Sequence, residues 1–78
     1  MTMAIDYDSL LTVEQKRNIL SQRISQFAAE AYQHSLNKQT CTNLEDAAGV
    51  EAADKSLAVL ESAIAIHKAE LETLPAAE

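Results

Sequence analysis

Two histidines lie near carboxylates at helical spacing, so they are the first residues to test for metal chemistry. Glu30 precedes His34 by four residues, and His67 precedes Glu70 by three. Di-metal sites in helical bundles need a glutamate that precedes a histidine by three residues on each of two helices. In the hairpin predicted below, the two histidines would also differ by about 18 Å along the axis. We therefore expect no metal and no cofactor, and we expect His67 to pair across a subunit contact or with a local carboxylate.

Nucleophilic catalysis finds no support in the sequence either. Cys41 lies seven residues after His34, which would place the two side chains about 10 Å apart on one helix face, beyond hydrogen-bond reach. The same cysteine is the only one in the chain, so no intrachain disulfide or thiolate zinc set is expected. The serines lack a nucleophile-elbow motif, and a single glycine leaves no phosphate-binding loop. The sequence therefore predicts that the protein is not an enzyme.

Net charge argues against nucleic acid as a partner. Arg17, Asn18, Gln22 and Arg23 form a short fragment rich in basic and amide groups, but the formal net charge is −6. Binding to nucleic-acid phosphates or to an anionic membrane surface needs clustered lysine and arginine. No apolar run is long enough to span a membrane. We therefore expect the partner to be neither nucleic acid nor a membrane.

The charge is unevenly distributed along the chain. Residues 13–44 carry four basic and two acidic side chains, a balance of +2, whereas residues 45–78 carry two basic and eight acidic ones, a balance of −6. An acidic track could imitate nucleic-acid phosphates and occupy a host protein that binds them. The track consists of Glu45, Asp46, Glu51, Asp54 and Glu61. A small acidic inhibitor is therefore the alternative function, although a solvated charged face is the simpler interpretation.

Apolar residues at alternating steps of three and four predict a long helix over residues 47–74 that packs along a partner helix. Its predicted core positions are Leu57, Leu60, Ile64, Leu71 and Leu74, with Val50 and Ala53 in the same series. A further group widens the apolar arc to about half the circumference, more than one partner helix can cover. This group, which we predict to form a protein interface, consists of Ala52, Val59, Ala63 and Ile66.

A second helix should precede this one. Thr12 and Gln15 match a capping box, so the helix should begin at Val13. Its predicted core positions are Val13, Leu20, Ile24, Phe27, Ala28, Tyr32 and Leu36. Its exposed side carries neutral amides and hydroxyls, and from these we take as interface residues Gln22, Gln26 and Gln33. A hydrogen-bonded contact with another chain would explain this composition, and so would a face that is merely solvated.

The reversal between the two helices is predicted at residues 43–46. Asn43 can adopt the left-handed conformation that ends a helix, and Asp46 is a good N-cap for the next one. In the alternative, Gly49 ends the first helix and Asp54 caps the second. The first choice gives helices of nearly equal length, which pair residue i with a residue at about 89 − i.

A chain of 78 residues is at the lower limit of what can bury a self-sufficient core, so association is expected. The predicted division is a leader at 1–12, a hairpin at 13–75 (helix 13–43, turn 43–46, helix 47–74) and a tail at 76–78. The leader either docks over the open end of the hairpin or is disordered. It lacks the basic region and apolar run of a signal peptide, and a lone cysteine fits a reducing cytoplasm.

Two segments resemble small, uncharacterised two-helix proteins found in tailed-phage genomes and related bacterial regions. They are 31–37 (AYQHSLN) and 63–71 (AIAIHKAEL), and the resemblance extends over roughly residues 12–75. It implies a phage-encoded accessory or virion-associated protein, located in the host cytoplasm or the virion, and it assigns no catalytic residue. Together these observations predict an all-α, antiparallel, coiled-coil-like hairpin that binds itself or a larger protein assembly.

Overall fold

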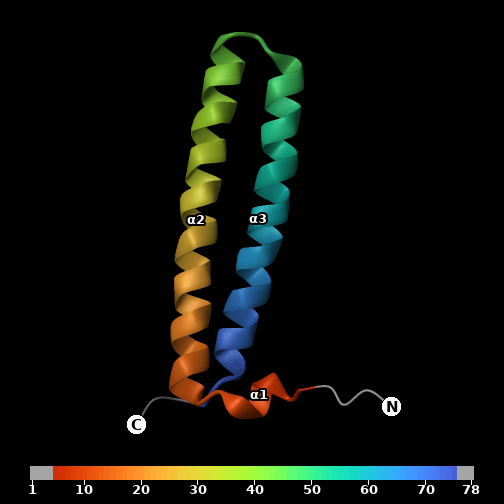
Figure 1. Cartoon of the computed structure of the whole chain (residues 1–78). Helices are drawn as coiled ribbons and strands as arrows, with labels where there is room; N and C mark the ends of the chain where they lie inside the picture. The colour runs from red at the N-terminus through yellow and green to blue at the C-terminus, as the bar shows by residue number, and fades with distance from the viewer. Residues whose placement is uncertain (1–4, 76–78) are drawn as a thin grey trace, which may run out of the picture.

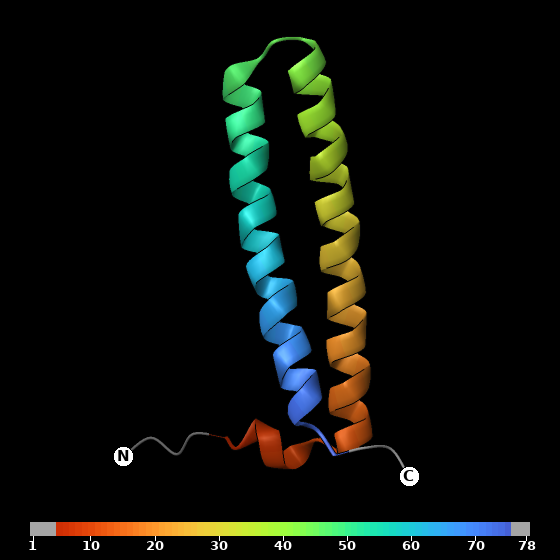
Figure 2. The ribbon, with the colours of Figure 1, turned by 180° about the vertical axis from the view of Figure 1, so that it is seen from behind.

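The computed structural model describes residues 5–75, which form three helices and no strand (Figure 1). The helices are α1 (Tyr7–Leu10), α2 (Val13–Asn43) and α3 (Ala47–Thr73). α2 and α3 run antiparallel and pack against each other, while α1 lies beside the open end of the hairpin in both views (Figures 1 and 2). The predicted all-α hairpin is therefore confirmed. Residues 1–4 of the predicted leader and the tail at 76–78 lie outside the described residues.

The start of α2 is fixed by the two side chains that the sequence indicated. The Thr12 hydroxyl accepts a hydrogen bond from the Gln15 backbone N–H at 3.0 Å, and the Gln15 side-chain oxygen accepts one from the Thr12 N–H at 2.8 Å. This reciprocal pair satisfies two backbone donors that the first turn would otherwise leave without partners. α2 consequently begins at Val13, at the predicted residue.

The described part of the leader forms the single turn α1. Asp6 caps it, accepting from the Ser9 hydroxyl at 2.6 Å and from the Ser9 N–H at 3.3 Å, and these hydrogen bonds lower the pKa of the Asp6 carboxyl. An ion pair of 3.0 Å between Asp8 and Lys16 links α1 to α2. Ile5, Tyr7 and Leu10 nevertheless stay exposed, while Leu11 is half-buried. The described part of the leader is thus partly helical and contributes little to a core.

In the turn between α2 and α3, Asp46 takes part both in the end of α2 and in the start of α3. The Asp46 N–H donates to the Cys41 carbonyl at 2.8 Å and the Glu45 N–H to the Thr42 carbonyl at 3.1 Å, which is the Schellman pattern of a helix end. The Asp46 carboxylate then accepts from the Gly49 N–H at 3.0 Å and caps α3. The left-handed residue is Glu45, with φ of 57°, so the prediction that Asn43 adopts this conformation is wrong.

Gly49 lets the helices approach closely next to the turn. A Cβ at this position would lie 2.5 Å from the Cys41 sulfur of α2 and 2.5 Å from a carboxylate oxygen of Asp46. Both atoms are the ends of side chains, so a larger residue at this position would require the Cys41 and Asp46 side chains to move. Gly49 therefore serves helix packing, and the alternative in which it ends the first helix is wrong.

The core is a single seam between α2 and α3, and it is thin. The apolar residues that the sequence placed in the core of α3 face α2. Ala53 and Leu60 among them are buried, with 5% and 9% of their surface exposed. The remaining predicted α3 core positions are half-buried: Leu57, Ile64, Leu71 and Leu74. On α2 the half-buried seam residues follow steps of three and four, namely Leu20, Ile24, Phe27, Ala31, His34, Lys38 and Cys41. The second half of the α2 seam is thus largely polar.

Four residues that the sequence placed in the core are exposed, and the prediction for them is wrong; they are Val13, Ala28, Tyr32 and Leu36. The last three are spaced by four residues, and each step of four advances about 40° around the helix, so the row drifts away from α3. The real seam alternates steps of three and four and stays facing α3. Val13 is exposed because α3 ends at Thr73, before it reaches the first turn of α2.

The helices are also shifted against each other relative to the predicted pairing. Lys38 forms an ion pair of 2.6 Å with Asp54, and Arg23 donates to His67 at 2.9 Å. These contacts place the true pairing one to three residues away from the predicted one. Arg17 accordingly donates to the Pro75 carbonyl, beyond the predicted level of Glu72.

Truncation of Leu60 tests how much stability the seam supplies. We expect Leu60→Ala to lower the free energy of unfolding by about 2–4 kcal/mol, because it removes the largest buried side chain of the described hairpin. The control is Leu44→Ala in the exposed turn, which should cost less than about 0.5 kcal/mol. Urea unfolding followed by far-UV circular dichroism measures both, and equal losses would contradict the placement of the core.

Candidate interaction surface

Val59 and Ile66 form the most exposed aliphatic row on α3. They expose 69% and 67% of their surface and lie seven residues apart, so they share one helix face. Ala52, seven residues earlier, is also exposed, and Ala63 is half-buried between this face and the seam. We call Ala52, Val59 and Ile66 the α3 stripe. At 100° per residue the stripe lies about 110–150° around α3 from the middle of the seam, so it points outward.

The predicted amide residues of α2 are exposed as well. Gln22, Gln26 and Gln33 lie about 110–150° around α2 from the middle of its own seam, so this amide row also points outward. The two rows therefore do not merge into one flat surface. A small groove of about 180 Å³ lies between α2 and α3. It is lined by His34, Asn37, Gly49, Ala52, Ala53 and Ser56. Ala52 of the stripe borders this groove, while Val59 and Ile66 and the amide row form separate surfaces on either side of it.

His67 occupies a seam position and is held by groups of the same chain. Its Nε2 accepts a hydrogen bond from Arg23 Nε at 2.9 Å, and its Nδ1 lies 2.6 Å from the Ala63 carbonyl oxygen. Arginine can only donate, so Nε2 must carry the lone pair and Nδ1 the proton. The expectation that His67 pairs across a subunit contact or with a carboxylate is therefore wrong for this hairpin.

Phe27 completes this cluster. Its ring packs edge-on against His67, with centroids 5.0 Å apart and an interplanar angle of 72°, and the Arg23 guanidinium carbon lies 5.2 Å from the Phe27 centroid. Arg23 and Phe27 are four residues apart and so stand on the same side of α2. Both ring nitrogens of His67 are engaged, which gives the cluster a structural role in aligning α2 with α3.

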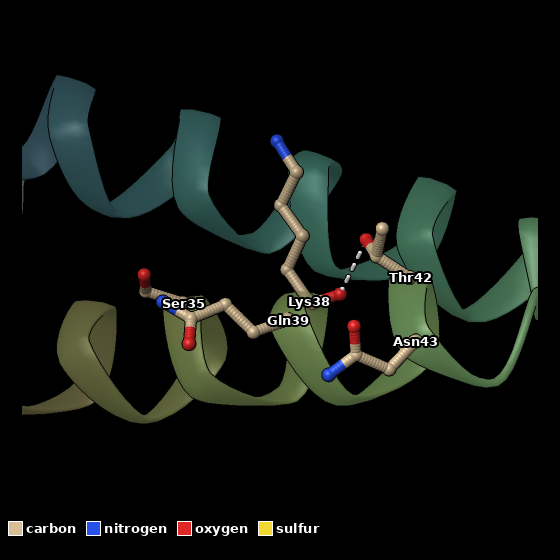
Figure 3. A pocket seen from close by; sticks show the side chains of 5 residues that line it. All are labelled: Ser35, Lys38, Gln39, Thr42 and Asn43. Carbon is tan, nitrogen blue, oxygen red and sulfur yellow. Dashed lines mark hydrogen bonds between the residues drawn. The ribbon is translucent and has the colours of Figure 1, made fainter.

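A second depression, of about 290 Å³, lies on α2 near the turn (Figure 3). All of its lining residues come from α2: Ser35, Lys38, Gln39, Thr42 and Asn43. The Thr42 hydroxyl donates to the Lys38 carbonyl at 2.8 Å, while the Lys38 side chain extends toward α3, where it pairs with Asp54 (Figure 3). Two of its polar side chains, Lys38 and Thr42, are thus engaged in contacts within the chain.

The described residues carry no grouping of three His, Cys, Asp or Glu side chains that could hold a metal ion. Within residues 5–75, no helix has both the length and the apolar character that crossing a membrane requires.

Comparison of the chain with protein-family models, with curated proteins and with solved structures gave no match. The α3 stripe is therefore the feature on which a function can be argued.

The tautomer of His67 tests the cluster that aligns the helices. We expect nitrogen-15 NMR of neutral His67 to show the proton on Nδ1, because Arg23 donates to Nε2. Arg23→Ala should move the ring toward the Nε2-protonated form, whereas Arg17→Ala, a change of another α2 arginine that contacts Pro75, should leave it unchanged. Protonation of Nε2 in the unaltered protein would contradict the described contact.

Proposed function

We propose that the chain is a non-enzymatic assembly protein, a helical hairpin that binds itself or a larger protein assembly through the α3 stripe. The observation that carries this proposal is the contrast between burial and exposure on α3. Val59 and Ile66 leave about two thirds of their surface exposed to water, whereas Ala53 and Leu60 of the same helix are buried. Aliphatic side chains gathered in a row on a small helical protein are typical of a protein interface.

The amide row gives this assembly a second, polar contact. Gln26 and Gln33 are exposed at the same seven-residue interval as Val59 and Ile66, and each carries both a donor and an acceptor. Such a row suits a hydrogen-bonded, hydrated contact with a larger particle. The resemblance to small proteins of tailed-phage genomes supports a phage-encoded accessory or virion-associated role, in the host cytoplasm or the virion.

The acidic inhibitor is less well supported as an alternative. Several acids of the proposed track are already engaged within the chain: Asp54 pairs with Lys38 at 2.6 Å, Glu51 lies 3.5 Å from Lys55, and Asp46 caps α3. A phosphate mimic needs free carboxylates in a regular row. Intrachain partners reduce the charge that such a row would offer to a host protein.

Lysine substitutions on the stripe test the proposal. In extracts of cells that produce the chain, we expect the unaltered protein to sediment as a species larger than the single chain. The double change Val59→Lys with Ile66→Lys should return it to the sedimentation rate of the single chain, because two charges would have to be buried in the contact. Far-UV circular dichroism should show unchanged helix content, since both positions are exposed.

A matched control lies on the same helix. Ala58 and Ala65 are exposed, seven residues apart and outside the stripe, so Ala58→Lys with Ala65→Lys adds the same charge at the same spacing. This variant should sediment like the unaltered protein. The proposal fails if the unaltered chain sediments as a monomer both when purified and in the extract, or if both double variants behave alike.

A further inference from the structure

We infer that the partner of the α3 stripe is a second copy of the chain, bound antiparallel, α3 against α3, about a two-fold axis that passes between Ser62 and Ala63. This inference rests on the proposed function and specifies its partner. Three observations carry it: the exposed aliphatic side chains of the stripe, the seam spacing of the face around them, and the placement of two charges on that face.

The proposed axis lies midway between Val59 and Ile66, and this position brings the aliphatic side chains of the two copies together. A two-fold axis between Ser62 and Ala63 that reverses the helix places Val59 opposite the partner's Ile66, and Ile66 opposite the partner's Val59. The same operation sets Ala52 opposite the partner's Thr73, a small residue against a short one. The aliphatic side chains of both copies then meet at the centre, where water is excluded most completely.

The broader face around the stripe also has the spacing of a helix-packing seam. Alternating steps of three and four describe a second series on α3, which runs Ala48, Ala52, Lys55, Val59, Ser62, Ile66, Ala69 and Thr73. Steps of this kind keep a row of side chains facing one neighbouring helix over many turns. α3 therefore carries one seam for α2 and a second, largely of small residues, for another helix.

One pair of charges favours the antiparallel over the parallel arrangement. Lys55 lies within this second series and Glu70 at its edge, on opposite sides of the midpoint between Val59 and Ile66, and both are exposed. The proposed axis places Lys55 opposite the partner's Glu70, and it does so twice because of the symmetry. A parallel pairing in register would instead set Lys55 against Lys55 and Glu70 against Glu70. Within one chain Lys55 reaches only Glu51, at 3.5 Å between two exposed side chains, so it remains available for the partner.

Engineered cysteines test the inference directly. In a Cys41→Ser background, Ser62→Cys places a thiol beside the axis, so the two copies should form a disulfide rapidly on mild oxidation of the purified protein. The matched variant is Ala52→Cys on the same stripe. In the antiparallel pair its two copies lie about 31 Å apart along the helix axis, so it should remain monomeric on denaturing gels.

Charge reversal provides an independent measurement. Lys55→Glu and Glu70→Lys should each weaken the dimer several-fold in sedimentation equilibrium, because each sets like charges against each other. The two changes together should restore the affinity of the unaltered protein. If both single changes have no effect, or if the double variant is weaker than either, the antiparallel pairing is wrong.

The outcomes separate this inference from the proposed function. Rapid cross-linking of Ser62→Cys without that of Ala52→Cys supports the antiparallel pair, whereas equal cross-linking of both overturns it in favour of a parallel contact. A purified chain that remains a monomer and does not cross-link at Ser62→Cys overturns the second copy as partner. The proposed function still stands in that case if the chain sediments in a larger species in the extract and the stripe variant abolishes it.

Discussion

Two helices that pack side by side touch along one line, and this limits what the hairpin can bury. A lone pair of helices has no third element to cover the flanks of the seam, so most seam residues remain half-exposed. The structure shows this in its dimensions: the radius of gyration is 17.4 Å, against about 12 Å for a compact domain of this length. Among the described residues, Ala53 and Leu60 alone are buried. The exposed stripe on α3 is a consequence of the same limit.

Polar contacts set the alignment that such a thin seam leaves weakly determined. Leucine and isoleucine at regular steps can slide by one turn and still find apolar neighbours, so the seam needs groups that fit in only one register. Arg23 with His67 near the open end, and Lys38 with Asp54 near the turn, provide two such points. Gly49 adds a close contact near the turn, since the Cys41 side chain occupies the space that a Cβ at this position would need. The helices are therefore aligned by polar and steric contacts, and held together by few buried aliphatic ones.

The sequence predicted the features that rest on local chemistry. The capping box at Thr12, the cap at Asp46 and the seam of α3 depend on residues a few positions apart, and all three occur where the pattern placed them. The α2 seam is harder to predict, because large apolar residues such as Tyr32 and Leu36 indicate a core position, although their spacing turns them away from α3. Steps of three and four from Leu20 lead to His34 and Lys38, which composition alone does not mark as seam residues. The Arg23 and His67 contact joins residues far apart in sequence, so no local pattern could indicate it.

The proposed partner of α3 would add to the stability of a hairpin whose seam buries so few side chains. Association couples to folding by mass action, so a dimer unfolds at a temperature that rises with chain concentration. The most direct measurement is the thermal midpoint of the purified protein over a hundred-fold range of concentration. The account predicts a midpoint that increases steadily across this range. A midpoint that stays constant would show that a single hairpin is stable without a second copy, and would contradict the proposed association through α3.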